Sequence, residues 1–268
     1  MKRVRQIAWL LLVLLALASL GAGFWAPADY ATQFREAPNS LPSHQHLLGT
    51  DELGRDRFSR VLYGTRVSLL MAPTAALLST LLAVLVGGVA GYLGGWWERA
   101  AMYATDLFLS MPWLFLLLAV RAMLPLNIAP ITSVAVTFLL LGLLGWAASA
   151  RVLCAGVRGL RDSDFVLLAR ASGVRGLRLL AVHVLPNLKP VLLAQFWISI
   201  PVFIISEANL GILGLGVSEP LPSWGSLLRE LESFASFGFE VWKLAPLVLL
   251  VGVVSSFQII LSREEAYA

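Results

Sequence analysis

Residues Asp162–Pro186, with the sequence DSDFVLLARASGVRGLRLLAVHVLP, are a charged, helix-forming segment in a chain that is otherwise mostly apolar. The apolar runs Ile131–Ser149 before this segment and Val191–Leu213 after it are each long enough to cross a bilayer. A loop that only reverses the direction of a membrane-spanning chain needs about 2–8 residues. The polar stretch 151–190 is several times longer, so we expect it to have structure of its own.

The first part of this segment favours a short helix. Asp162, Ser163 and Asp164 can cap its start and place negative charge near its N-terminus, where that charge is stabilising. Gly173 stands where a left-handed residue commonly ends a helix.

A second helix, Val174–Leu185, is expected after the glycine, and Pro186 is expected to end it because proline can neither donate a backbone hydrogen bond nor continue the turn. On this helix we predict an apolar stripe formed by Leu177, Ala181 and Val184. A separate basic stripe would be formed by Arg175 and Arg178. A helix–glycine–helix hairpin with two such faces suits a groove on another protein. It equally suits a membrane surface with anionic lipid headgroups, and spacing alone leaves both possibilities open.

Composition places the chain among membrane proteins. Its mean hydropathy is +0.80, and 58% of its residues are hydrophobic whereas only 13% are charged. A chain of 268 residues has room for about five to seven spans of about 20 residues each. We therefore predict an all-α fold, a polytopic transmembrane helix bundle with about six spans.

The expected spans lie at 7–25, 67–95, 101–124, 131–150, 191–213 and 243–261. They divide the chain into an N-terminal transmembrane helix at 1–25, an extracytoplasmic segment at 26–66, and a core domain at 67–268 that contains the loop 151–190. Lys and Arg are more numerous on the side that would hold both termini and this loop. That bias predicts a multi-pass protein of the cell (inner or plasma) membrane with both termini and the loop in the cytoplasm.

Motifs of enzymes and metal sites are absent from the sequence. It contains no G-x-x-x-x-G-K-[ST] phosphate loop, no H-E-x-x-H and no G-x-S-x-G. A single cysteine, Cys154, excludes a disulfide framework, and His44 and His46 lack a third ligand at a suitable spacing and are expected to be solvated. Basic residues are spread through the loops, so no nucleic-acid partner is expected. We predict neither an enzyme nor a bound cofactor or metal, and energy for any active process would come from a partner or an ion gradient.

Two acidic residues fall within expected spans, where a charged side chain costs at least about 2.5–3.5 kcal/mol. Asp106 lies near the start of its span and is expected to be a helix-start residue or to join an inter-helix hydrogen bond. Glu207 lies deeper and could face a water-filled pathway or a seam between helices. A stand-alone ion-coupled secondary transporter or channel would use these two acids as coupling groups.

Glycines in the second span predict a close helix–helix contact. Gly87, Gly91 and Gly95 recur at every fourth position and would leave a smooth strip on the helix surface. Small residues at this spacing allow a second helix to approach closely in a membrane.

Several motifs along the chain resemble one family. They are HLLGTDELGRDRFSRVLYGTRVSL, GYLGGWWERAAMYATDLFLSMP, DFVLLARASG, HVLPN and LGLGVSEPLPSWGSLL. Together they are similar to the permease subunits of bacterial ABC importers of the dipeptide, oligopeptide and nickel type, and most similar to the second of the two permeases in such a system. The resemblance covers roughly residues 40 to 245.

The segment 162–186 resembles the cytoplasmic EAA loop of these permeases. Ala169, Gly173 and the run Val184–Asn187 stand in the matching positions. Leu167 stands where the family has the glutamate that opens the loop, and Leu168 where it has the first alanine. The tail QIILSREEAYA also lacks the Gly-Asp-rich ending that is usual in the family.

The resemblance implies a set of partners. In such importers the loop docks in a cleft of an ATPase subunit, and closure of two ATPases pulls the loops together and switches the helices between inward-open and outward-open states. The expected partners are a second homologous permease subunit, two ATP-binding subunits, an extracytoplasmic substrate-binding protein and membrane lipid, with ATP bound by the partner subunits.

The resemblance also implies roles for residues of the loop. The expected docking residues are Asp164, Phe165, Ala169, Arg170, Ser172, Gly173, Arg175, Arg178 and Pro186. Of these, four would form the docking face, namely Phe165, Ala169, Ser172 and Gly173, and the three arginines would pair with acids at its rim. The segment Gly214–Leu228 would lie near the pore mouth or the dock of the binding protein.

Overall fold

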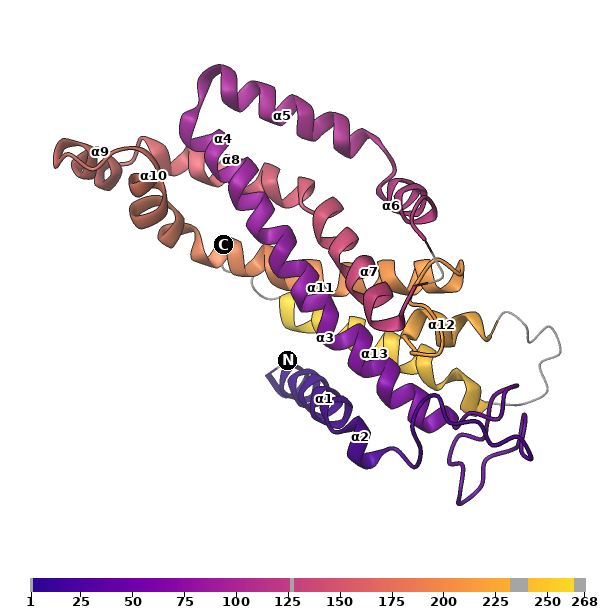
Figure 1. The fold of residues 1–268 in the computed structure, drawn as a ribbon. Coiled ribbons are helices and arrows are strands. Elements are labelled where there is room, and N and C mark those ends of the chain that lie inside the picture. Colours follow the sequence, from indigo (N-terminus) through magenta and orange to yellow (C-terminus); the bar gives the residue numbers. More distant parts are fainter. Residues whose placement is uncertain (1, 126–127, 232–240, 263–268) are drawn as a thin grey trace. The chain divides into compact units, whose positions relative to one another are not determined.

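A computed structural model describes residues 2–125, 128–231 and 241–262, and the tail from residue 263 lies outside the described part (Figure 1). Within these ranges all regular elements are helical, and the only β-type pairings are two isolated bridges, Gln33–Arg55 and Thr50–Asp56. The longer helices are α1 (Lys2–Leu20), α3 (Arg57–Ala83), α5 (Gly95–Ser110), α6 (Trp113–Ala122), α7 (Pro130–Leu144), α8 (Ala147–Arg161), α11 (Lys189–Ile212) and α13 (Ala245–Leu261). The shorter ones are α2 (Ala22–Trp25), α4 (Val89–Leu93), α9 (Asp164–Ala171), α10 (Gly176–Leu179) and α12 (Trp224–Arg229). The all-α prediction is confirmed.

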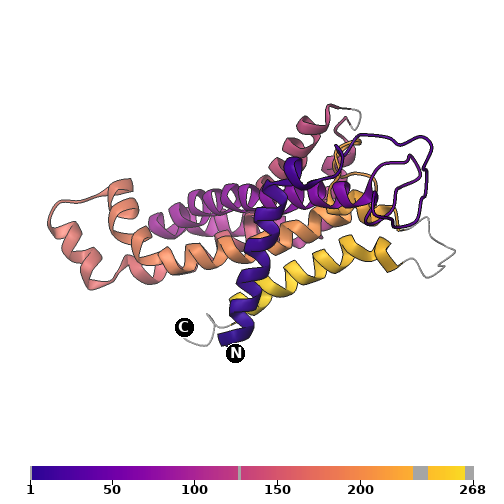
Figure 2. The ribbon, with the colours of Figure 1, turned by 90° about the horizontal axis from the view of Figure 1, so that it is seen from below.

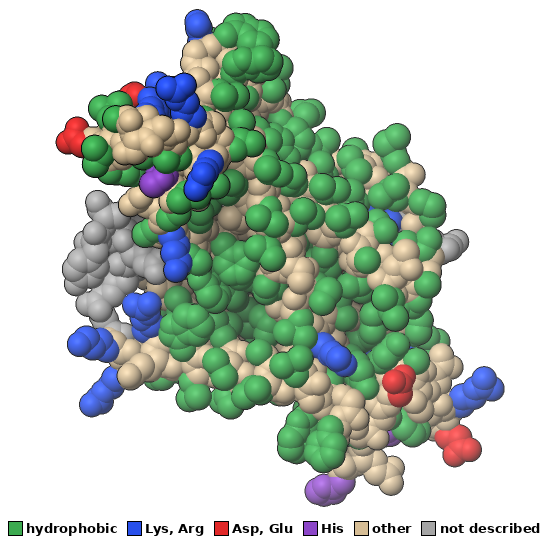
Figure 3. Space-filling view, turned by 60° about the vertical axis from the view of Figure 1, so that its left-hand side comes forward, with side chains coloured by type: hydrophobic (Ala, Val, Ile, Leu, Met, Phe, Trp, Pro, Cys, Tyr) green, Lys and Arg blue, Asp and Glu red, His purple; other side chains and the backbone are tan. Residues whose placement is uncertain are grey.

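Helix length and composition agree with about six spans. Four helical stretches are long and apolar enough to cross a membrane: Lys2–Leu20, Arg57–Leu93, Gly176–Ile212 and Val241–Leu261. Two bent helix pairs, α5 with α6 and α7 with α8, raise the number to six if each pair is one span. On the face shown in Figure 3, hydrophobic side chains cover most of the surface. Such a surface suits lipid, since larger exposed apolar patches mark membrane or protein contacts.

The third expected span is broken. α5 and α6 are bent by 79° at residues 111 and 112, where a single helix over 101–124 was predicted. Met111 has extended torsion angles, φ −79° and ψ 133°. A residue before proline is pushed out of the helical region by the proline ring, and Pro112 itself cannot donate to a helical carbonyl.

The predicted helix stop at Pro186 is wrong. α10 continues through a π-helical turn, η2 (Leu180–Val184), and a 3₁₀ turn, η3 (Leu185–Leu188), into α11. Pro186 lies in the first positions of η3, where the missing N–H leaves no helical hydrogen bond unmade. The helix therefore changes its winding around the proline rather than ending there.

The chain forms two compact units: unit 1 comprises Met1–Pro73, Val120–Phe138 and Pro201–Ala268, and unit 2 comprises Thr74–Ala119 and Leu139–Ile200. Within unit 1, α1 packs against α13, and Figure 2 shows α1 crossing beside the C-terminal end of that helix. α12 in the same unit starts with a capping box, in which the Ser223 hydroxyl accepts from the Ser226 N–H at 3.2 Å and the Ser226 hydroxyl accepts from the Ser223 N–H at 2.9 Å.

Unit 2 is built around α8, which packs against α4, α5 and the π-helical turn η1 (Val84–Gly88). A Cβ atom at Gly87 would overlap the carbonyl oxygen of Ala150, and one at Gly91 would lie 2.6 Å from the carbonyl oxygen of Cys154. The predicted close approach is thus confirmed for these two glycines. It is wrong for Gly95, which starts α5 and has no atom within 4 Å of its Cβ position.

Candidate functional site

The α9–α10 hairpin in unit 2 has one buried face. The cluster at its base consists of Val157, Val166, Ala169, Leu179, Leu180, Val184 and Leu188. Three of these, Leu180, Val184 and Leu188, follow one another at four-residue spacing and form the buried stripe. The predicted stripe is therefore only partly right, since Leu177 is 69% exposed and Ala181 is also exposed. This cluster fixes the hairpin to the end of α8.

The turn between the two helices has the expected left-handed glycine. Gly173 has φ +87°, its N–H bonds to the carbonyl of Arg170 at 3.0 Å, and the N–H of Val174 bonds to the carbonyl of Ala169 at 3.1 Å. This pair of bonds is a Schellman motif, which satisfies the last carbonyls of α9. At the other end Ser163 is the N-cap residue, but its hydroxyl donates to the Leu160 carbonyl at 2.6 Å instead of capping α9.

The opposite face of the hairpin is exposed and partly apolar. Phe165 is 39% exposed, Leu167 48% and Leu168 70%. The predicted docking residues that are also exposed are Asp164, Ser172, Gly173, Arg175, Arg178 and Pro186, whereas Arg170 is half-buried. The prediction that Ala169 belongs to the docking face is wrong. Ala169 is 9% exposed and belongs to the buried cluster, because helical periodicity places it on the same face as Val166.

Asp106 makes an inter-helix ion pair. It lies in the second half of α5, not at a helix start, and its carboxylate is 3.2 Å from the Arg151 guanidinium of α8. Both side chains are about half exposed. A second pair between the same helices, Glu98 with Arg158 at 3.0 Å, was not predicted. Glu98 is the more enclosed acid, since its side chain is 13% exposed.

Glu207 of α11 lies at a helix seam of unit 1. Its side chain is fully buried, and its Oε2 accepts from the Ser68 hydroxyl of α3 at 3.0 Å. The Ser68 hydroxyl also accepts from the Trp224 N–H at the start of α12, at 3.0 Å. Of the two predicted surroundings for Glu207, a helix seam and a water-filled pathway, this arrangement matches the seam.

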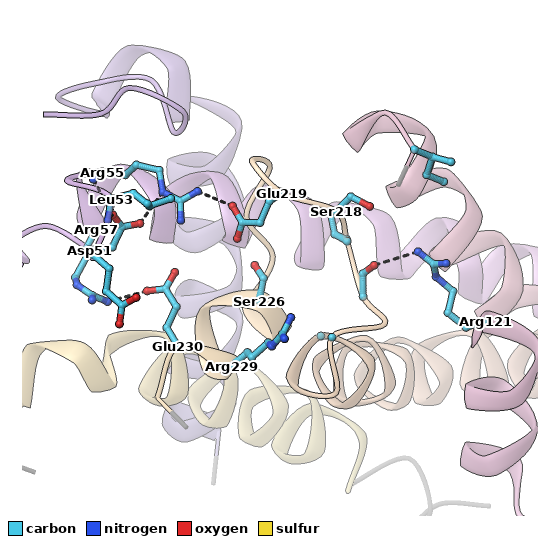
Figure 4. A pocket seen from close by; sticks show the side chains of 16 residues that line it. Asp51, Leu53, Arg55, Arg57, Arg121, Ser218, Glu219, Ser226, Arg229 and Glu230 are labelled. Carbon is cyan, nitrogen blue, oxygen red and sulfur yellow. Dashed lines mark hydrogen bonds and ion pairs between the residues drawn. The ribbon is translucent and has the colours of Figure 1, made fainter. Parts of the chain in front are cut away.

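A network of ion pairs in unit 1 joins the start of α3 to the segment around α12. Arg60 is fully buried and reaches Glu219 at 3.1 Å, Glu230 at 3.0 Å and Asp51 at 3.6 Å. Arg55 pairs with Asp51 at 2.6 Å and with Glu219 at 2.6 Å, as Figure 4 shows. Residues more than 150 positions apart in the sequence are thereby held together.

The network separates the pKa values of its two glutamates. Burial alone would raise the pKa of Glu219, but the Arg60 and Arg55 guanidinium groups outweigh it and hold this pKa below its ordinary value. Burial dominates at Glu230, where it raises the pKa despite Arg60 and Arg57. Burial also acts to lower the pKa of Arg55, yet Glu219 and Asp51 raise it overall.

Sequence reasoning missed this network, although the run TDELGRDRFSR contains four of its members. A dense alternation of acids and arginines beside a span is a signal that could have found it. The expectation of solvated loop histidines is also wrong for His46, whose Nδ1 lies 2.9 Å from the Asp56 carboxylate and whose side chain is 12% exposed. His44 is exposed as predicted.

A cavity of about 720 Å³ lies beside the network in unit 1. Its charged and polar lining residues are Asp51, Glu52, Arg55, Arg57, Arg121, Ser218, Glu219, Ser226, Arg229 and Glu230. Figure 4 shows Arg55, Glu219 and Glu230 gathered in one part of the site and Arg121 apart from them. The predicted segment Gly214–Leu228 thus supplies much of the wall of a polar pocket.

Comparison with known proteins shows which family the chain is similar to. Residues 83–263 match the family described as "Binding-protein-dependent transport system inner membrane component". The chain is 32% identical over 222 residues to the dipeptide transport system permease protein DppC of Bacillus subtilis (strain 168), a match that covers 83% of this chain and 67% of that protein. For the oligopeptide transport system permease protein OppC of the same organism the identity is 30% over 242 residues, with coverage of 90% and 77%. The nickel transport system permease protein NikC of Escherichia coli (strain K12) is 33% identical over 231 residues, with coverage of 85% and 80%.

These similarities confirm the resemblance that the motifs carried. The family match covers more than half of the chain and includes α8, the α9–α10 hairpin, α11 and α13. It describes membrane components of transport systems and does not favour a stand-alone ion-coupled transporter. The chain is a multi-pass membrane protein, and it belongs to the family of binding-protein-dependent transport system inner membrane components.

Proposed function

We propose that this chain forms part of the translocation pathway of an ATP-driven importer for di- or oligopeptides. The names of DppC and OppC support a peptide as the solute, and the name of NikC leaves a nickel complex as the second candidate. The working assembly would contain a second homologous permease, two ATP-binding subunits and an extracytoplasmic binding protein. Both termini and the α9–α10 hairpin would lie in the cytoplasm.

One observation supports the hairpin as the element that couples the chain to an ATPase. Its inner face is buried against α8 and the start of α11, while Phe165, Leu167 and Leu168 remain exposed on its outer face. An apolar face that is rigidly held and unpartnered suits a groove on another protein. Leu167 and Leu168 would give an apolar contact at the positions where the family has glutamate and alanine.

Gly173→Trp is expected to abolish binding of the ATPase subunit, whereas Gly173→Ala should weaken it by less than about tenfold. Both variants place a residue with a Cβ atom at φ +87°, so both lose the same conformational stability in the turn. Neither side chain clashes within the chain at its Cβ atom, since nothing lies within 4 Å of that position. Only the tryptophan adds bulk to the outer surface of the hairpin. Co-purification of the ATPase with each variant from membranes measures the difference.

The alanine variant is the control, since it separates backbone strain from bulk. Equal recovery of the ATPase with wild type and Gly173→Trp would show that the hairpin is not the docking element. If the hairpin lies on lipid headgroups instead, Gly173→Trp should also leave ATP-driven transport unchanged.

Uptake of a radiolabelled peptide by the whole complex in proteoliposomes should require ATP and survive both Asp106→Asn and Glu207→Gln. Asp106 is half exposed in an ion pair, and a glutamine in place of Glu207 can still accept the hydrogen bond from Ser68. Uptake driven by a proton gradient without ATP, and lost in either variant, would instead support ion coupling.

A further inference from the structure

We propose that the pocket in unit 1 is a carboxylate-binding site, in which Arg121 and Arg229 receive the carboxylate of the transported solute. The identity of that group as a peptide C-terminus rests on the proposed function. The binding of a carboxylate itself rests on the charges of the pocket.

Arg121 is a buried cation whose charge is not compensated within the described residues. It is fully buried, and among the described residues its guanidinium donates hydrogen bonds to neutral oxygens: the carbonyl of Pro125 at 3.4 Å, the hydroxyl of Ser133 at 3.4 Å and the carbonyl of Gly216 at 3.3 Å. Its Nε has no hydrogen-bond partner in this part of the chain. A buried charge is costly unless an opposite charge pairs with it, so the site favours an anion.

Arg229 adds a second positive charge beside the same turn. Its guanidinium packs on Gly214, so close that a Cβ atom added there would lie 2.9 Å from Nη1. Gly214 stands two residues before Gly216, whose carbonyl accepts the hydrogen bond from Arg121. Among residues 2–125, 128–231 and 241–262, no acidic side chain forms an ion pair with Arg121 or Arg229. The two guanidinium groups therefore flank the turn 214–216 with unbalanced positive charge.

Three of the four acids that line the pocket, Asp51, Glu219 and Glu230, are already paired with other arginines, whereas Glu52 forms no ion pair among the described residues. Glu219 is held by Arg55 and Arg60, and Glu230 by Arg57 and Arg60. Figure 4 shows this paired group to one side of the pocket, with Arg121 on the other. The pocket is thus polarised, and its positive side is the one that can take up a further negative charge.

The form of the pocket suits a small solute. Its volume of about 720 Å³ lies within the range of about 300–1,000 Å³ that is typical of small-molecule sites. Gly211, Gly214 and Gly216 also line it. The space beside them is filled by the backbone of Gly225, by the Arg229 guanidinium and by the backbone of Gly211, so these glycines let the wall of the pocket pack closely. A guanidinium group is planar and matches the two oxygens of a carboxylate.

Binding of trialanine and of its C-terminal amide to the complete transporter in nanodiscs tests the proposal, with saturation-transfer NMR as the readout. The wild-type complex should bind the free carboxylate roughly tenfold to a hundredfold more tightly than the amide, as expected for a hydrogen-bonded charge. Arg121→Gln should reduce this preference to about threefold or less. Arg35→Gln, at an exposed position outside the pocket, is the matched control and should retain it.

Each contrary outcome has its own meaning. Equal binding of the two ligands by wild type would overturn the carboxylate site, while ATP-driven peptide uptake by the same complex in proteoliposomes would leave the proposed function standing. Carboxylate-selective binding without any peptide uptake would do the reverse. If Arg121→Gln does not assemble, Arg229→Gln decides, since Arg229 is exposed and its loss should lower the preference several-fold. An acid of the second permease paired with Arg121 in the assembled complex would also overturn the proposal.

Discussion

Arg60→Met is expected to lower the free energy of unfolding by about 3–5 kcal/mol, because it removes the central cation from a buried network. Glu219, Glu230 and Asp51 all lie within 4 Å of the Arg60 guanidinium, which is itself fully buried. Arg55 and Arg57 would remain, but neither contacts all three acids. Denaturant titration of the purified chain in detergent measures the change.

Arg66→Gln is the matched control for this experiment. Arg66 lies on the same helix, α3, but is exposed, and a substitution there should change stability by no more than about 0.5 kcal/mol. Stability of Arg60→Met equal to that of wild type would mean that the network does not hold α3 to the segment around α12. A Met side chain also fills part of the space, so a loss of stability reports on charge more than on a cavity.

Gly87→Ala is expected to destabilise unit 2 by about 1–3 kcal/mol or more, since an added methyl group would meet the backbone of another helix. The new Cβ would overlap the carbonyl oxygen of Ala150 and lie 2.7 Å from its carbonyl carbon. Backbone atoms cannot rotate away as a side chain can, so α8 would have to shift. Because α8 carries the α9–α10 hairpin at its end, recovery of the ATPase subunit should fall as well.

Gly159→Ala gives the same chemical change without the contact. Gly159 lies within α8 and has no atom within 4 Å of its Cβ position, so alanine should stabilise the helix slightly through its higher propensity. A thermal unfolding midpoint for Gly87→Ala at or above that of Gly159→Ala would contradict the close contact between η1 and α8.

The α9–α10 hairpin was predicted only in part from its own sequence. Gly173 was placed correctly because a helix end needs a left-handed residue, and glycine adopts that conformation without a Cβ penalty. The burial of Ala169 and of the stripe through Leu180 was not predicted, because it depends on how the two arms of the hairpin pack on each other and on Val157 of α8. The stop at Pro186 failed for a related reason: packing of Val184 and Leu188 on α8 keeps the chain helical through a proline that the winding can accommodate.

The ion-pair network marks a limit of a different kind. Arg55 and Arg60 lie within a short stretch of sequence that also contains Asp51, but Glu219 and Glu230 come from a segment more than 150 residues away. Alternating acids and arginines in the sequence can indicate that these residues form ion pairs. The alternation does not show which arginine pairs with which acid. Glu207 is similar, since only the position of Ser68 on α3 distinguishes a helix seam from a pathway.

By itself, the sequence determined the helical class, the membrane-spanning character and the family, because hydrophobic run length, helix-end residues and motif spacing are properties of short stretches. Tertiary structure alone decided the angle at which α5 and α6 meet, which face of the hairpin is buried, and which arginines remain without an acid among the described residues. Burial and ion pairing depend on residues brought together from distant parts of the chain, and their energies follow from distances and solvent exclusion that no local pattern encodes.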